Sequence, residues 1–437
     1  MMMKVTPILP ETLKTLEEGY AKRPELAVMS TVLTNVALEN AAFDPRKVIQ
    51  ERMDFNIVVP TTKITNQKQS GRCWMFAVMN MLRERTIKKL NVEDFSFSGA
   101  YLAFYDKLEK CNNFFESIIA YSDQDIDDRE TYQFLEKPLG DGGEWEMCAG
   151  LIQKYGLVPY WIMPETSASN GTAQHLNVFN RKLREDALRL REAMKNGSDV
   201  DALRVEMLQE IYNGLCVLYG QPPKSFDLEY TDKDKNYHSV KGLTPIQFFE
   251  EYVGNDLDDY AVIICNENRA FYEVYDKPWQ MNLVEKSYAW LNLPMEEMEK
   301  ITIDALKKGE LVMFSCDSTR YGERALGYWD PDCWKFEEIL GMKLSMSAKG
   351  SLVSHDSTTT HCMCFCGVNL DENGVPDRWK IENSWGKENG QEGYYICSES
   401  YFHKYVYQVI VPKHVLSDEQ KAMFNKPVVP MKVWENV

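Results

Sequence analysis

The chain has 437 residues, of which 44% are hydrophobic and 26% charged, so it is long enough for a large core and two or three subregions. Its formal net charge is −17, and no cluster of Lys and Arg rises above the background. This charge makes a nucleic-acid-binding protein or an anionic-membrane surface an unfavoured alternative, because both need a concentrated basic patch. No stretch approaches 18 consecutive apolar residues, so no membrane span is predicted.

The beginning of the chain and its cysteines indicate the compartment. The first ten residues lack the apolar run of a signal peptide. Eleven cysteines are scattered from Cys73 to Cys397 without the spacings of a disulfide framework. We therefore expect reduced thiols and a cytoplasmic protein.

The N-terminal part is predicted to be largely helical. Apolar residues recur at a spacing of three to four over 12–20 and 26–42. A short β-like run at 55–60 follows. Residues 74–90 are predicted to form a buried helix, because the first half of this run is apolar on nearly every side. A second buried helix is expected at 96–108.

Cys73 immediately precedes the predicted helix at 74–90. Backbone N–H groups are unpaired at a helix N-terminus and the helix dipole is positive there, so a thiolate is favoured. The thiolate is the nucleophilic form of cysteine. Gln67, six residues upstream, could offer its side-chain amide to an oxyanion near the sulfur. The alternative is a buried helix that happens to begin with cysteine, and helix position alone does not decide between the two.

The middle of the chain predicts a glycine turn and then a helical module. Gly142-Gly143 precedes a helix expected at 146–155, and glycine pairs of this kind let a ligand backbone approach closely, although most are simply turns. From 177 to 218 the pattern becomes strongly helical and charged. A polar segment with hairpin character follows at 225–241.

The last part of the chain predicts several strands and one helix, and the run at 360–369 alternates too little for a half-exposed strand, so it is expected to be buried on both faces. The strands are expected at 260–265, 311–316, 360–369, 379–386 and 393–397, and the helix at 295–308, closed by Gly309. If the strands at 360–369 and 379–386 pair antiparallel, His361 and Asn383 can lie side by side.

Cys73, His361 and Asn383 thus follow one another in the order nucleophile, base and orienting residue. In such a site the imidazole takes and returns protons while a polar side chain fixes its tautomer. His361 alone would more often be structural, and His355 is close enough to be a competitor. The sequence Asn383-Ser-Trp-Gly386 favours His361, because Trp385 could shield an Asn–His contact from water.

Four motifs resemble those of papain-like cysteine peptidases, and the bleomycin hydrolase and aminopeptidase C branch is the closer match. They are Asn66-Gln-Lys-x-Ser-Gly-Arg-Cys-Trp74, Asp141-Gly-Gly-x-Trp145, Lys154-Tyr-Gly-Leu-Val-Pro159 with Met163-Pro-Glu-Thr166, and Glu382-Asn-Ser-Trp-Gly386. The similarity runs from about residue 50 to 410. It implies an α+β, two-lobed papain-like fold, with a helical lobe, an antiparallel β lobe and a large helical insertion.

The resemblance also implies the roles of the site residues. Cys73 would be the nucleophile, His361 its proton partner, and Asn383 the residue that orients His361. Gln67 and the Cys73 backbone N–H would hold the oxyanion, and Trp385 would cover the Asn–His contact. The expected chemistry is acylation of Cys73 by a peptide carbonyl, loss of the amine and hydrolysis by water, with no cofactor and no metal.

The expected division of the chain follows from the same resemblance. The gap between Cys73 and His361 is 361 − 73 = 288 residues, about twice the roughly 130–150 of the simple papain pattern. Additions of this kind resemble the hook and helical regions that build a hexameric barrel, so a homohexamer is implied. The divisions are a helical extension at 1–55, the nucleophile lobe at 56–176, an inserted helical module at 177–255, the β lobe at 256–415 and a tail at 416–437.

Substrate recognition is expected at two places. Gly142 and Gly143 match the turn that hydrogen-bonds substrate backbone in papain-like enzymes. In aminopeptidases of the branch the chain end enters the cleft, but the tail here lacks their Asp-Pro-Met-Gly signature. If Val437 still reaches the cleft, its carboxylate can anchor the amino group of an oligopeptide, and we expect an aminopeptidase. An open cleft would give an endopeptidase instead.

Two further alternatives remain at the level of sequence. Cys362, Cys364 and Cys366 would share one face of a strand and could suggest a metal, but zinc sites usually need a second ligand pair, and buried free cysteines are the preferred interpretation. A catalytically inactive scaffold is disfavoured because the cysteine, histidine and asparagine are all present.

Overall fold

One lobe of the molecule is built on a twelve-stranded sheet. The computed structural model describes residues 6–50 and 52–435, and the strands lie in the order β14-β5-β6-β4-β13-β7-β10-β11-β12-β9-β8, with β1 beside β10. Their bounds are β1 Ile57–Val58, β4 Tyr260–Ile264, β5 Val274–Asp276, β6 Trp290–Asn292, β7 Val312–Cys316, β8 Gly322–Glu323, β9 Tyr328–Trp329, β10 His361–Leu370, β11 Pro376–Glu382, β12 Tyr394–Ser398, β13 Val406–Pro412 and β14 Val429–Pro430.

Helices form the other lobe and cover the sheet. Their bounds are α1 Pro10–Ala21, α2 Pro24–Leu33, α3 Leu38–Ala42, α4 Pro45–Gln50, α5 Cys73–Leu90, α6 Gly99–Ala120, α7 Arg129–Glu136, α8 Trp145–Tyr155, α9 Ser167–Asn170, α10 Ala173–Asn196, α11 Val200–Tyr219, α12 Pro245–Phe248, α13 Met295–Lys307, α14 Phe336–Leu340, α15 Ala348–Val353, α16 Glu399–Tyr405 and α17 Asp418–Met423. No helix in the described ranges has the length and apolar character needed to cross a membrane.

The centre of the sheet carries the predicted histidine and asparagine. β10 pairs antiparallel with β11, with Cys364 opposite Glu382, which meets the condition under which His361 and Asn383 can lie side by side. β10 is buried along most of its length, which is why its apolar residues do not alternate with polar ones. The strand expected at 379–386 ends earlier, at Glu382. Beyond Glu382 the chain turns and pairs through Trp385 with Asn66 instead.

α5 joins the two lobes. The helix is buried over its first eleven residues, Cys73 to Arg83, as its apolar sequence predicts, and packs against β10. Arg83, which is 1% exposed, forms a 2.9 Å ion pair with the fully buried Glu382 on β11. Removing Arg83 would leave Glu382 as an unpaired buried charge, so this pair links the nucleophile helix to the strand that precedes Asn383.

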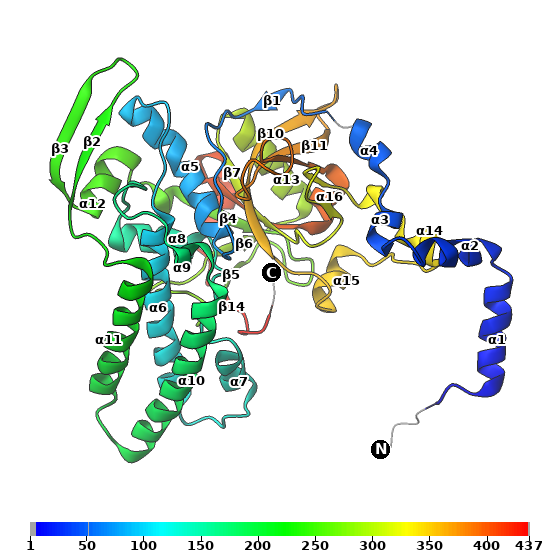
Figure 1. Cartoon of the computed structure of the whole chain (residues 1–437), viewed down its shortest axis with the longest axis horizontal. Coiled ribbons are helices and arrows are strands. Elements are labelled where there is room, and N and C mark those ends of the chain that lie inside the picture. The colour runs from blue at the N-terminus through cyan, green and yellow to red at the C-terminus, as the bar shows by residue number, and fades with distance from the viewer. Residues whose placement is uncertain (1–5, 51, 436–437) are drawn as a thin grey trace.

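The helical module and the N-terminal arm lie at opposite ends of the molecule (Figure 1). α10 and α11 form a long pair that packs on α6, and the hairpin of β2 (Phe226–Thr231) and β3 (Tyr237–Leu243) stands beyond α12. α1 extends away from both lobes, α2 lies against α14, and neither α1 nor α2 has a buried residue. The observed architecture is the predicted α+β combination of a helical lobe and a β lobe, and the buried helix expected at 96–108 extends to Ala120.

Candidate active site

Cys73 is the first residue of α5. The preceding residue, Arg72, provides no side-chain hydrogen bond to the free N–H groups of the first turn. The positive end of the helix dipole is therefore uncompensated beside the sulfur, which favours the thiolate. Cys73 is 8% exposed, so its side chain is largely shielded from water.

His361 and Asn383 are in direct contact. Nε2 of His361 lies 2.9 Å from Oδ1 of Asn383. The backbone N–H of Ser384 donates to the same oxygen at 2.7 Å, so the oxygen rather than the amide nitrogen faces the histidine. Nε2 therefore carries a proton and donates it to Asn383, which leaves Nδ1 of His361 as the nitrogen that exchanges a proton with a thiol.

The surroundings of Cys73 hold the pKa of its thiol well below the usual value. The largest cause is a hydrogen bond from the Cys362 side chain; burial opposes it, and the charge of His361 acts in the same direction as Cys362. Cys362 is in turn 3.2 Å from the hydroxyl of Ser315, whose proton is donated to Gln408. A cysteine with these neighbours is poised as a nucleophile.

Trp385 covers the contact between His361 and Asn383. Its ring stacks on the imidazole with centroids 4.5 Å apart and an interplanar angle of 24°. The guanidinium of Arg324 covers Trp385 at 4.5 Å. Asn383 is completely buried, so its hydrogen bond to His361 forms without competition from water.

Gln67 lies beside the same loop. Its backbone N–H donates to the carbonyl of Ser384 at 2.8 Å, and its side-chain oxygen accepts a 2.7 Å bond from the Ser384 hydroxyl. The side-chain Nε2 donates to the carbonyl of Ser70 at 2.6 Å. Since a primary amide has two N–H groups, the second remains for an oxyanion near Cys73.

The glycine turn packs directly against the residue after Cys73. A Cβ on Gly143 would lie 2.6 Å from the indole ring of Trp74, whereas a Cβ on Gly142 would meet nothing within 4 Å. The indole Nε1–H donates to the carbonyl of Asp141 at 2.8 Å, and Asp141 Oδ2 accepts a 2.9 Å bond from the backbone of Gly71. The turn and the nucleophile segment are thus one hydrogen-bonded unit.

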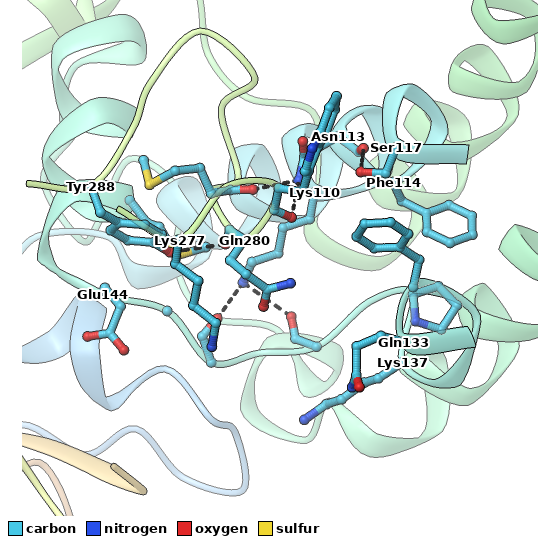
Figure 2. A pocket seen from close by; sticks show the side chains of 18 of the residues that line it. Lys110, Asn113, Phe114, Ser117, Gln133, Lys137, Glu144, Lys277, Gln280 and Tyr288 are labelled. Atoms are coloured by element: carbon cyan, nitrogen blue, oxygen red, sulfur yellow. Dashed lines mark hydrogen bonds between the residues drawn. The ribbon is translucent and has the colours of Figure 1, made fainter. Parts of the chain in front are cut away.

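A cavity of about 310 Å³ opens beside this turn (Figure 2). Gly142, Gly143 and Glu144 form one wall, while Lys277 and Gln280 come from the loop after β5. The other lining residues are Lys110, Asn113, Phe114, Ser117, Gln133, Phe134, Lys137, Pro138, Gly140, Met147, Trp279, Met281, Tyr288 and Trp290. The cavity is large enough for the side chain of one residue together with nearby backbone.

The C-terminal tail passes the rim of this cavity. β14 pairs with β5, and the N–H of Met431 donates to the carbonyl of Asp276, the residue before Lys277. Trp434 lies 4.0 Å beneath the guanidinium of Arg129, which begins α7, a helix that contributes Gln133 and Phe134 to the cavity. Val437 lies outside the described residues.

Several features of the site were not predicted. The first is Cys362, which was interpreted only as a buried apolar residue. The missed signal was its place directly after His361 on β10, which puts it near the thiol that exchanges a proton with His361. The second is the pair Glu144 and Lys277 in the cavity wall. The only signal for Glu144 was its place directly after Gly143, and nothing in the sequence indicated Lys277. His355, the competing histidine, is exposed and carries a positive φ of 58°.

Metal ligation is possible at one place in the described part of the chain. Glu299, Glu399 and His403 offer ligand atoms within 4.8 Å of one another, on α13 and α16. Cys364, one of the three cysteines on β10, instead donates to the carbonyl of Ala77 at 3.4 Å.

Comparison with known proteins gives one consistent family. The model of the Peptidase C1-like family matches residues 8–437. The chain is 36% identical to aminopeptidase E of Lactobacillus helveticus, covering 98% of each chain. It is 37% identical to aminopeptidase G of Lactobacillus delbrueckii subsp. lactis, covering 98% of this chain and 99% of the other. The crystal structure of PepW from Lactobacillus rhamnosis matches with a TM-score of 0.95 at 34% identity, covering 100% of this chain and 99% of that one.

Proposed function

Because the chain belongs to the Peptidase C1-like family and is a cysteine-type aminopeptidase with a papain-like fold, we propose that Cys73, His361 and Asn383 form its catalytic site. The observations that carry the proposal are the hydrogen bond between His361 and Asn383 and the influence of His361 on the thiol of Cys73, whose pKa it helps to lower. Nδ1 of His361 takes the proton of Cys73, and Asn383 holds the imidazole by its other nitrogen.

The reaction then proceeds through a thioester. The Cys73 thiolate attacks the carbonyl carbon of the first peptide bond, and the oxyanion is held by the Cys73 N–H and the free N–H of Gln67. His361 returns its proton to the leaving amine. A water molecule, deprotonated by His361, then attacks the thioester and releases the amino acid and Cys73.

We assign the tail the role of closing the cavity beyond the substrate's first residue. The supporting contacts are the pairing of β14 with β5, the burial of Val433, and the 2.7 Å ion pair between Glu435 and Arg269. In this proposal Gly142 and Gly143 bind the backbone of an oligopeptide, and the carboxylate of Val437 limits the cleft. An endopeptidase is the alternative if the tail leaves the cleft open.

The test compares a free-amine aminoacyl reporter with its N-acetylated counterpart. We expect the intact chain to prefer the free amine. Removal of residues 434–437 should let the chain cleave internal bonds of longer peptides, because the contacts at Arg129 and Arg269 are then lost. Preference of the intact chain for blocked or internal substrates would contradict the aminopeptidase proposal.

The compartment and the assembly belong to the same proposal. All eleven cysteines are free, as suits a reducing compartment, and we propose the cytoplasm. The arm of α1 and α2 exposes apolar side chains, including Ile8 at 74%, Leu16 at 58% and Val28 at 63%. A monomer rarely leaves so much apolar surface open, which supports self-assembly, and the proposed number of six chains comes from the resemblance to the bleomycin hydrolase branch. Light scattering would find six times the 50.7 kDa of one chain, and Leu16→Asp should lower that mass.

A further inference from the structure

Glu144 lines the cavity that opens beside the Gly142-Gly143 turn. Of the described residues that line the cavity, it is the only acidic one, against three lysines. Its Oε2 atom is shielded from solvent and makes no hydrogen bond in the described part of the chain. A shielded carboxylate oxygen without a donor is costly, so such a group indicates a partner that arrives from outside.

The lysines of the cavity do not supply that partner. Lys110 is held by Asp106 at 2.8 Å and by the carbonyl of Gly142 at 2.7 Å. Lys277, from the loop after β5, forms no ion pair within the described ranges. Burial raises the pKa of Glu144 to about 8, Glu146 adds to this effect, and Lys277 only partly opposes it. Burial likewise lowers the pKa of Lys277.

The position of Glu144 near Cys73 is where the amino group of an aminopeptidase substrate is expected to lie. In an aminopeptidase substrate, the amino group is separated from the attacked carbonyl carbon by one N–Cα–C unit, about 2.5 Å long. The amine must therefore lie against the wall next to Cys73. Glu144 follows Gly143, which packs on Trp74 beside the nucleophile, and the charge of Cys73 is near enough to raise the pKa of Glu144 further.

We propose that Glu144 binds the α-ammonium group of the substrate and so selects peptides with a free N-terminus. This inference rests on the proposed aminopeptidase function and names the residue that recognises the amine. The tail then limits how far the cleft extends, whereas Glu144 supplies a carboxyl group that becomes a carboxylate when the ammonium group binds beside it, because a nearby positive charge lowers its pKa. The two contributions can be separated, because Glu144 belongs to the cavity wall and remains when the tail is removed.

The test uses Glu144→Gln, which keeps the shape of the side chain but removes its charge. Three leucyl reporters are compared: the free amine, a desamino analogue of the same length, and the N-acetylated form. We expect kcat/KM for the free amine to fall roughly 10- to 100-fold, since a charge-assisted hydrogen bond is lost, with the desamino analogue unchanged. Glu136→Gln is the matched control, because it makes the same substitution at an exposed residue that does not line the cavity.

The outcomes separate this inference from the proposed function. If Glu144→Gln lowers the free-amine and desamino reporters equally, or changes neither, the role of Glu144 is refuted while the intact chain still prefers the free amine. If the free-amine advantage over the desamino analogue disappears on removing residues 434–437 but survives in Glu144→Gln, the tail carries the amine site and the inference is wrong. If Glu144→Gln affects only arginyl or lysyl reporters, Glu144 recognises a substrate side chain rather than the α-ammonium group, and the inference is wrong. If the intact chain prefers the N-acetylated reporter, the aminopeptidase proposal itself fails.

Discussion

Replacing Gly143 by alanine should damage both the fold and the active site. The added Cβ would lie 2.6 Å from Cε2 of Trp74, about 0.9 Å inside the shortest comfortable carbon–carbon distance. Trp74 is completely buried, and its indole N–H is held by Asp141, so the ring has little room to withdraw. Overpacking of this kind costs about 1–3 kcal/mol of unfolding free energy.

The same strain acts on Cys73, the neighbour of Trp74, and a misplaced nucleophile loses roughly 100-fold in rate per ångström. Chemical denaturation and kcat/KM for a free-amine reporter would measure the two effects. Gly142→Ala is the control for stability, because its Cβ meets nothing within 4 Å. If Gly143→Ala is as stable and active as the wild type, or Gly142→Ala is equally destabilised, the packing of the turn on Trp74 is refuted.

Three further predictions concern proton placement. Asn383→Ala removes the 2.9 Å bond that fixes the tautomer of His361, so kcat should fall roughly 10- to 100-fold with little change in KM; an unchanged kcat would contradict the assignment. Cys362→Ala should raise the pKa of Cys73, so the pH profile of Cys73 alkylation moves upward, and an unmoved profile would exclude Cys362 as a donor. Two glutamates raise the pKa of His403 to about 10, above the roughly 6.5 of an unfolded chain. The stability that His403 adds over His403→Gln should therefore be complete below about pH 6.5 and lost as pH rises toward 10, and a difference that grows with pH would be the wrong sign.

Local pattern predicted most of the framework of the site. The apolar run after Cys73 predicted the helix correctly. The first part of this helix is buried on all sides, so its sequence is apolar all round and needs no alternation with polar residues to be recognised. The two runs were expected as strands, and their antiparallel pairing, which the sequence left as a condition, brings His361 to Asn383. Trp385 stacks on His361, where the spacing to Asn383 allowed it to shield the contact.

The cavity could not be predicted in the same way. Lys277 comes from a loop more than 130 residues after Glu144, and no periodicity relates two loops that meet only through the fold. The early end of β11 also has a tertiary cause, because the segment after Glu382 pairs with residues 65–67 rather than continuing in the sheet. Cys362 was interpreted as a buried apolar residue, because the sequence pattern of a strand does not reveal that the neighbouring helix α5 begins with the thiol of Cys73.

Selective alkylation tests the central assignment most directly. The pKa is raised for nine of the other ten cysteines, by burial in eight of them and by the contact with Cys73 and then burial in Cys362, whereas that of Cys73 is lowered. With iodoacetamide at mildly acidic pH, mass spectrometry should find one label, on Cys73, and aminopeptidase activity should fall in proportion to it. Activity that survives complete labelling of Cys73, or that is lost with a label on another cysteine, would contradict the assignment of Cys73 as the nucleophile.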